Sequence, residues 1–302
     1  MSKFYINKLA IIGLGLMGGS LARALKAQGA VGEVVATGRR AASLEKGLAL
    51  GVIDAWTLDM KEAVANADVV VIATPTLIAE NVLAELAPLM TPSMVVTDVA
   101  SVKGNMLRAA ERVFGEVPAN FVMGHPIAGS EQSGVEAATV DLFLDHRVIL
   151  TPLATTAETG TALIQAMWEV CGAEVVCMDV AEHDSVLAAT SHLPHVLAYT
   201  LVDALAQNGS AADIFRFAAG GFRDFTRIAS SDPTMWHDIA LANQDAILQG
   251  IDDFSAHLDK VRAAIASGDG DSLYATFDRA KRARDEHFLG QYLSRQKKSP
   301  SS

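Results

Sequence analysis

The feature that most constrains this chain is a glycine-rich turn close to its start. An apolar run at residues 9–12 is followed by Gly13, Gly15 and Gly18 in the spacing G-x-G-x-x-G, and apolar residues then recur at helical intervals. In a strand–turn–helix unit, the first glycine permits a sharp turn, the second lets a pyrophosphate approach the backbone, and the third allows close packing of helix on strand. The free N–H groups at the helix start attract phosphate. The stretch predicts a dinucleotide-binding site, with a purely structural glycine turn as the alternative.

Short apolar runs then alternate with helical patterns as far as residue 178. The run DVVVIA at 68–73 is apolar almost throughout, which is typical of a strand buried on both faces. Such alternation predicts an α/β fold with a Rossmann-type, doubly wound parallel sheet. Other strands are expected at residues 33–37, 94–98, 120–124, 147–151 and 174–178.

The pattern changes near residue 180, after which no convincing strand is found. Helical patterns cover residues 180–207, 238–267 and 272–293, and Pro194 should kink or break the first. Long apolar helices usually bury one face against something, and a second copy of the chain is the simplest partner. We therefore expect a dinucleotide-binding domain at 1–179, an all-helical substrate and dimerisation domain at 180–295, and a disordered tail at 296–302.

Composition limits the partners. The 302 residues carry a formal net charge of −11, with a pI near 5.1. An acidic chain is repelled by nucleic acid and by anionic lipid, so neither is an expected partner. Two cysteines, no apolar leader segment and no stretch of membrane-spanning length together favour a cytoplasmic location.

The end of the second strand should decide which dinucleotide binds. An NAD site usually carries an acid there for the ribose 2′-hydroxyl, but in this chain Arg39 and Arg40 follow the strand. Guanidinium groups pair with a 2′-phosphate, and Thr37 and Ser43 could donate to it as well. We expect NADP, and NAD is possible if the two arginines are ordinary surface charges.

Ligands of doubly wound sheets bind beyond the carboxyl ends of the strands. At two of these ends, Leu16, Met17, Thr74 and Pro75 are expected to contact the cofactor together with the glycines.

Two later strand ends carry side chains that could do chemistry. Asp98 and Ser101 follow the strand at 94–98, where Ser101 could donate to a substrate oxygen or both could cap the next helix. His125 follows the strand at 120–124, and an imidazole accepts a proton readily near neutral pH.

The helical region contributes a third group. His192 and His195 could share a helix face, but no third ligand accompanies them and no metal site is expected. Arg227 could bind a substrate carboxylate, or form a surface salt bridge with Asp224.

Taken together and in this order, the motifs resemble the prephenate/arogenate (cyclohexadienyl) dehydrogenase family of tyrosine biosynthesis, along nearly the whole chain. The resemblance rests on DVASVK at 98–103, GHPIAGSE at 124–131, SHLPH at 191–195, and GFRDFTRIA at 221–229 with Trp236 after it. It implies an NAD(P)-dependent oxidation in which hydride leaves C4 of a cyclohexadienol, the ring carboxylate departs as CO2, and the ring becomes aromatic. Prephenate would give 4-hydroxyphenylpyruvate, and arogenate would give tyrosine.

The resemblance also implies residue roles and a homodimer formed through the helical domain. His125 would be the catalytic histidine that takes the 4-hydroxyl proton, and Ser101 would hydrogen-bond the same hydroxyl. Residues expected to contact substrate or line the pocket mouth are Ser191, His195, Arg227, Glu131, Asp224 and Trp236. With no appended mutase or regulatory domain expected, tyrosine inhibition would act at the active site.

Two other functions stay open at this point. A 6-phosphogluconate-type hydroxyacid dehydrogenase would need a catalytic lysine in the second domain, and residues 180–242 contain none. A non-catalytic NADP-sensing module would not need Ser101, His125 and Arg227 together. The sequence does not choose between prephenate and arogenate.

Overall fold

The structure, a computed structural model, describes residues 4–130 and 132–289. The chain divides into two compact units, with the division between Ile247 and Leu248. Residue 180, where the sequence pattern changes, lies inside the first unit, so the expected domain boundary stays a prediction. The expected tail at 296–302 lies outside the described residues.

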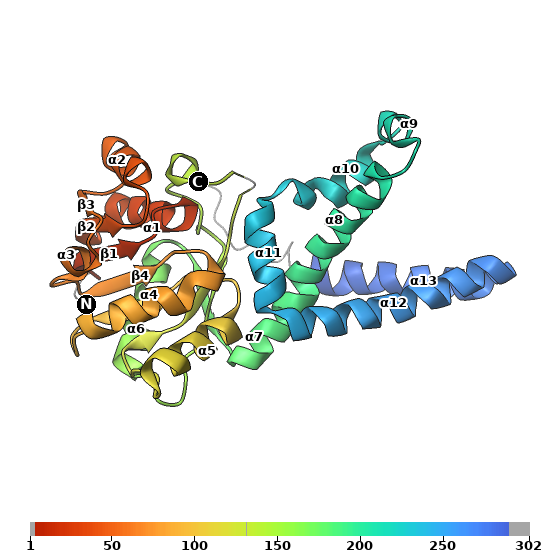
Figure 1. Ribbon diagram of the computed structural model, residues 1–302. Coiled ribbons are helices and arrows are strands. Elements are labelled where there is room, and N and C mark those ends of the chain that lie inside the picture. Colours follow the sequence, from red (N-terminus) through yellow and green to blue (C-terminus); the bar gives the residue numbers. More distant parts are fainter. Residues whose placement is uncertain (1–3, 131, 290–302) are drawn as a thin grey trace. The chain divides into compact units, whose positions relative to one another are not determined.

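Six parallel strands form the central sheet of the first unit, in the order β3-β2-β1-β4-β5-β6. Figure 1 labels the first four of these strands, β3, β2, β1 and β4. The winding reverses between β1 and β4, which defines the doubly wound class that the sequence predicted. The three-residue strand β3 was not foreseen, because it is too short to produce an apolar run. The bounds are β1 Ile6–Ile12, β2 Val31–Thr37, β3 Ala55–Thr57, β4 Val69–Ile72, β5 Val95–Asp98 and β6 Phe121–Val122.

Helices cover both faces of this sheet. The bounds are α1 Leu16–Ala27, α2 Ala41–Ala49, α3 Met60–Val64, α4 Ala79–Leu86, α5 Lys103–Phe114 and α6 Glu158–Val170, with short 3₁₀ turns η1 Thr76–Ile78, η2 Ala87–Leu89 and η3 Val135–Ala137. Successive strand residues point to opposite faces. Leu9 and Ile11 of β1 therefore pack in one core with α1 and α6, whereas Ala10 and Ile12 pack in a second core with α4 and α5.

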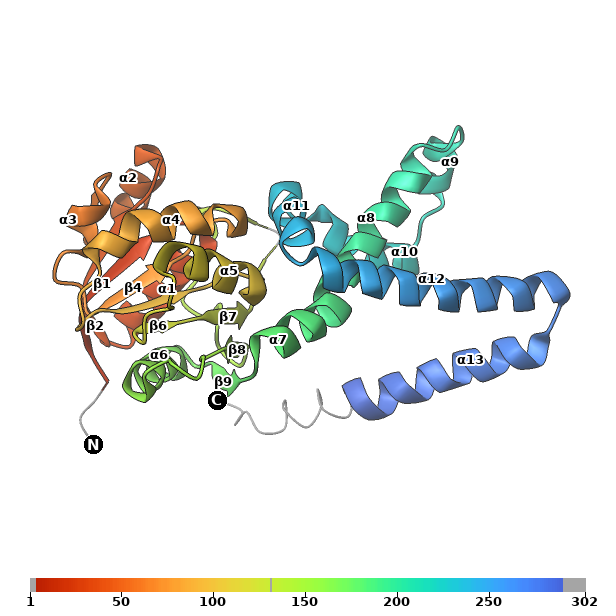
Figure 2. The same ribbon diagram turned by 60° about the horizontal axis from the view of Figure 1, so that its bottom comes forward.

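The strand expected at 120–124 is wrong in one respect, because two strands in two sheets occupy this region. After β6 the chain bends at Met123, and β7 Gly124–Ile127 pairs antiparallel with β8 Arg147–Leu150, which pairs parallel with β9 Glu174–Cys177. A Cβ at Gly124 would lie 3.2 Å from the carbonyl oxygen of Asp98, so the bend favours a residue without a side chain. Figure 2 shows β9 leading into the first helix of the helical region.

The helical region begins with a helix that changes its hydrogen-bonding pattern. The bounds are α7 Val180–Leu187, the π-helical η4 Ala188–His192, α8 Leu193–Ala206, α9 Ala211–Arg216, α10 Gly220–Thr226, the 3₁₀ turn η5 Arg227–Ser230 and α11 Pro233–Ala242. Pro194 lies in the first turn of α8, and the π-helical turn directly before it is the interruption that this proline predicted.

The single helix expected at 238–267 is wrong as well. α11 ends at Ala242, Asn243 has a non-helical conformation, and α12 Gln244–Ser267 begins after it. In the second unit the rest of α12 turns back at Gly268, whose φ is +67°, into α13 Gly270–Ala283 and the π-helical η6 Arg284–Leu289. None of the helices within the described ranges is both long and apolar enough to cross a membrane.

Candidate active site

The glycine turn has the steric properties expected of a dinucleotide-binding turn. Gly13 has a φ of +94°, and a Cβ on it would lie 2.7 Å from the carbonyl oxygen of Ala73. A Cβ on Gly18 would lie 2.8 Å from the side chain of Ile11, so this glycine lets α1 approach β1. A Cβ on Gly15 would meet nothing within 4 Å. The space beside Gly15 is therefore free for a ligand at the start of α1.

Two cavities meet at this turn. One has a volume of about 650 Å³ and the other about 610 Å³, and both are lined by Gly15, Thr74 and Pro75. Leu16 and Met17 line the larger cavity, so the expected cofactor contacts of the turn and of the β4 end lie together. The hydroxyl oxygen of Thr74 is buried and has no hydrogen-bond partner among the described residues. These features fit an elongated dinucleotide laid across the turn.

The smaller cavity lies at the end of β2. It is lined by Thr37, Arg39, Arg40 and Ser43, the residues expected to receive a 2′-phosphate. One carboxylate, that of Glu85 on α4, also lines it. The charges of this cavity are therefore cationic on the β2 side and anionic on the α4 side.

The end of β5 holds a buried ion pair. The Lys103 ammonium donates to the carboxylate of Asp98, and also to the carbonyl oxygen of Gly124 at 2.5 Å. Both side chains are fully buried. The alternative that Asp98 and Ser101 cap the helix is wrong, because Asp184 of α7 accepts from the backbone N–H groups of Lys103 and Gly104 at the start of α5.

His125 lies in β7, not in a loop after a strand. It is opposite Ile149 of β8, directly after the bend between the two sheets. The Lys103 ammonium, at the start of α5, donates to the carbonyl of the preceding residue, Gly124, and so helps to fix the backbone of β7 that carries the imidazole. His125 is largely buried and lines the larger cavity, as Ser101 does.

A chain of hydrogen bonds runs from His125 to a carboxylate. Nδ1 of His125 lies 2.9 Å from Nε2 of His183, and Nδ1 of His183 lies 2.8 Å from Oδ1 of Asp184. Burial raises the pKa of Asp184, but hydrogen bonds from His183 and from two backbone amides outweigh it and lower the pKa. An ionised Asp184 accepts from His183 Nδ1–H, and when this is the one proton on the His183 ring, Nε2 of His183 accepts from His125 Nδ1–H. Nε2 of His125 is then left unprotonated.

The environment of His125 favours its neutral form. Burial lowers its pKa well below 6.5, and His183, Lys103 and His192 lower it further. A neutral imidazole with a bare Nε2 at a cavity wall can accept a proton from a ligand hydroxyl.

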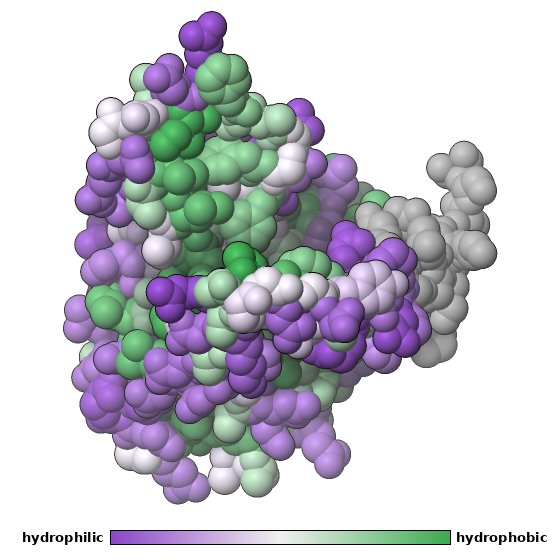
Figure 3. Space-filling model, turned by 90° about the vertical axis from the view of Figure 1, so that its right-hand side faces the viewer, coloured by the Kyte–Doolittle hydropathy of each residue, from purple (hydrophilic) through white to green (hydrophobic). Residues whose placement is uncertain are grey.

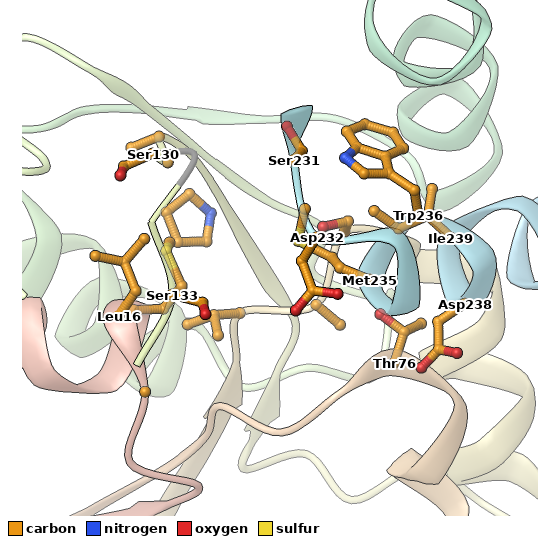
Figure 4. A pocket seen from close by; sticks show the side chains of 18 of the residues that line it. Leu16, Thr76, Ser130, Ser133, Ser231, Asp232, Met235, Trp236, Asp238 and Ile239 are labelled. Carbon is orange, nitrogen blue, oxygen red and sulfur yellow. The ribbon is translucent and has the colours of Figure 1, made fainter. Parts of the chain in front are cut away.

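The helical elements form the opposite wall of the larger cavity. His195 donates from Nδ1 to the carbonyl of Ser191 at 2.8 Å and stacks on Trp236, with ring centroids 3.5 Å apart. His192, on the π-helical turn, has its ring edge toward the same indole. In Figure 4, Trp236 and Ile239 of α11 lie across the cavity from Leu16, Ser130 and Ser133.

Most of the expected substrate residues come together in this cavity. Ser191, His195, Arg227 and Trp236 all line it. Asp224 does not line it, because its side chain is 72% exposed and accepts from the Arg223 guanidinium.

Glu131 lies outside the described residues. No cluster of potential metal ligands occurs within the described ranges.

Sequence reasoning missed His183, Asp184 and Asn243. His183 and Asp184 are adjacent at the start of the helical region, and a His–Asp dipeptide there was the available signal. Nothing in the local sequence links them to His125, which is 58 residues earlier.

The fold and the cavity define a class of protein: a dinucleotide-dependent dehydrogenase whose cavity is lined by a buried histidine of the second sheet and by an arginine of the helical region. Comparison with known families agrees. Residues 21–177 match the family model "Prephenate dehydrogenase, nucleotide-binding domain", and residues 179–279 match "Prephenate dehydrogenase, dimerization domain".

The chain belongs to the prephenate/arogenate/cyclohexadienyl dehydrogenase family. It is 40% identical to the cyclohexadienyl dehydrogenase of Zymomonas mobilis, over 91% of this chain and 94% of the relative. It is 37% identical to the prephenate dehydrogenase of Bacillus subtilis, over 92% of this chain and 76% of the relative.

A solved structure is also similar along nearly its whole length. The prephenate dehydrogenase of A. aeolicus, in complex with hydroxyphenyl propionate and NAD+, superposes with a TM-score of 0.87 at 34% identity and covers 94% of this chain and 99% of that one. The chain is therefore an oxidoreductase of tyrosine biosynthesis with a nucleotide-binding domain.

Proposed function

We propose that this enzyme oxidises and decarboxylates prephenate, arogenate or both, and that His125 is its catalytic base. The observation that carries the proposal is the hydrogen-bond chain from Asp184 through His183, which leaves Nε2 of a buried, neutral His125 unprotonated at the cavity wall. The cyclohexadienyl and prephenate dehydrogenases to which the chain is similar act on this class of substrate.

His125 handles one proton twice in this scheme. Its Nε2 accepts the proton of the 4-hydroxyl while the electrons of the C4–H bond leave as hydride. The carbonyl formed at C4 then accepts the electrons of the bond to the ring carboxylate, which departs as CO2. The ring becomes an aromatic phenolate, and His125 returns the proton to its oxygen, so the histidine ends unchanged.

The cofactor supplies a nicotinamide that accepts the hydride. The residues that would hold it are the glycine turn, Leu16, Met17, Thr74 and Pro75, and their open space and unpaired hydroxyl fit a dinucleotide. Arg39 and Arg40, with Ser43, would receive a 2′-phosphate, and we infer a preference for NADP over NAD.

The helical wall would bind the anionic part of the substrate. Arg227 would pair with a carboxylate, because a guanidinium matches two carboxylate oxygens. Ser191 and His195 add polar contacts, and Ser101 would hydrogen-bond the 4-hydroxyl from the sheet side. Glu131 remains a candidate for the pocket mouth on the family resemblance alone, whereas Asp224 does not line the cavity.

The test is formation of reduced cofactor with prephenate and with arogenate, each at saturating NADP and then NAD. Turnover with either substrate supports the reaction, and the four rates rank substrate and cofactor together. Absence of turnover, with NADP still bound, would favour the sensing module. Activity on a hydroxyacid phosphate instead would favour the 6-phosphogluconate type.

We also infer a homodimer formed through the helical region. Apolar side chains gather on the face seen in Figure 3, and the large ones exposed between residues 193 and 247 of the first unit are Leu201, Phe215, Phe217, Phe225, Met235 and Leu241. In the second unit they are Leu248, Phe254, Leu258, Ile265, Tyr274 and Phe277. Exposed apolar groups in this number are typical of an interface. Light scattering should give twice the 31.9 kDa mass of one chain, and a monomer at micromolar concentration would contradict the inference.

A further inference from the structure

Asp184 is linked to two cavity histidines by different groups. Its carboxylate reaches His125 through His183, as described above. Its backbone carbonyl accepts from Nδ2 of Asn243 at 2.9 Å, and the same Nδ2 lies 3.1 Å from Nδ1 of His192. Asn243 and His192 are both nearly fully buried, with exposed fractions of 6% and 1%.

The protonation of His192 follows from these two contacts. A backbone carbonyl only accepts hydrogen bonds, so the Asn243 atom facing it must be the amide nitrogen. That nitrogen has two hydrogens, and the second points to Nδ1 of His192. Nδ1 must then be an acceptor, and the proton of a neutral imidazole lies on Nε2. His192 lines the cavity, and Nε2 is the ring nitrogen that does not face Asn243.

We propose that Asn243 holds His192 in the Nε2–H tautomer, and that His192 donates this hydrogen to an acceptor-only oxygen, carboxylate or carbonyl, of the bound substrate. Asp184 thereby imposes opposite roles on two rings of one cavity. His125 presents a bare nitrogen that takes a proton, and His192 presents a hydrogen that binds an oxygen. Asn243 lies between α11 and α12, where the helix is interrupted. This interruption sets the position of the Asn243 side-chain amide. The proposal rests on the proposed function for the identity of the substrate, but not for the tautomer.

Other features of His192 agree with a neutral donor. Burial lowers its pKa to about 4, so the ring is uncharged at neutral pH. Its neighbour His195 has the reverse arrangement, because Nδ1–H of His195 donates to the carbonyl of Ser191 and leaves Nε2 bare. The two rings of the SHLPH motif thus offer one donor and one acceptor to the same ligand.

The first experiment reads the tautomer without any substrate. Long-range ¹H–¹⁵N spectra of the full-length enzyme, labelled with ¹⁵N-histidine, distinguish protonated Nδ1 from protonated Nε2, and the signal lost in His192→Gln identifies the residue. We expect a neutral Nε2–H ring in the wild type. In Asn243→Asp the new carboxylate would accept from Nδ1–H and shift the proton away from Nε2. Asn208→Asp, an exposed change of the same kind, should leave the spectrum unchanged. A wild-type Nδ1–H ring would overturn the proposal.

The second experiment separates a donor to substrate from a structural side chain. The amide nitrogen of a glutamine reaches roughly the position of Nε2, and that of an asparagine roughly the position of Nδ1. His192→Asn should raise KM for prephenate or arogenate about 10- to 100-fold with kcat within about threefold, and His192→Gln should restore most of the loss. Equal KM values for the two variants, or a fall in kcat with KM unchanged, would overturn the assignment. Failure of the wild type to turn over either substrate would refute the proposed function, and the spectra would still decide the tautomer.

Discussion

Replacing His183 tests the catalytic assignment without touching the substrate or the cofactor. In His183→Leu, Nδ1–H of His125 loses its acceptor in a buried site. A buried donor without a partner costs about 1–3 kcal/mol. The cost applies only to the His125 tautomer that is protonated on Nδ1, whose Nε2 can accept a proton from substrate. The tautomer protonated on Nε2 does not bear it, so the equilibrium shifts away from the active form.

The size of the effect follows from the tautomer equilibrium. A shift of about 1–3 kcal/mol lowers the ratio of the active tautomer to the alternative about 5- to 150-fold, since each 1.4 kcal/mol is a factor of ten. We expect kcat/KM to fall in His183→Leu by more than twofold and by up to that factor, with the Kd for NADP unchanged. In His183→Gln the amide oxygen can accept from His125 while the amide nitrogen donates to Asp184, so this variant should recover most of the activity.

The assay is formation of reduced cofactor under saturating NADP, with NADP binding measured by calorimetry on the same preparations. If His183→Leu retains activity within about twofold of the wild type while binding NADP normally, the tautomer argument is refuted. Equal losses in the leucine and glutamine variants would also count against it, because the hydrogen bond would then not be what matters.

Three further predictions concern the turn, the anion site and acid stability. Gly15→Ala should weaken NADP binding at least about tenfold with Tm nearly unchanged, because the added Cβ meets no protein atom but occupies ligand space. Gly18→Ala should instead lower Tm, because its Cβ would contact Ile11. Calorimetry measures the binding and thermal melts measure Tm, and the reverse pattern would show that the turn does not hold the cofactor. Arg227→Lys should raise KM for substrate about 10-fold or more, since a lysine cannot replace a bidentate guanidinium, and an unchanged KM would place the carboxylate elsewhere. Burial lowers the pKa of His192 from 6.5 to about 4. Below pH 6.5 the unfolded chain therefore binds a proton that the folded chain does not, and the free energy of unfolding should decline as the pH falls toward 4. The Tm of His192→Gln should depend less on acid pH than that of the wild type, and identical profiles of Tm against pH would refute this cause.

The sequence predicted the parts of the site that lie on short segments. The spacing of Gly13, Gly15 and Gly18 depends on the local path of one strand, one turn and one helix, so it can be identified without the rest of the chain. The buried strand at 68–73 was predicted for the same reason, because unbroken apolar composition reflects burial on both faces. His125 was selected by its position after a strand, although in the structure it lies within β7, a strand of a second sheet.

The sequence by itself thus determined the fold class, the cofactor turn and the residue types available for catalysis, since these depend on local periodicity and on motifs of a few residues. The tertiary structure decided how those residues are protonated and capped. Asp184 is 81 residues from the helix N-terminus it caps at Lys103 and 59 residues from Asn243. Hydrogen bonds need donor and acceptor within about 3 Å, and sequence periodicity carries no information about which distant residues folding brings that close. The roles proposed for His125 as base and for His192 as donor therefore depend on contacts that exist only in the folded chain.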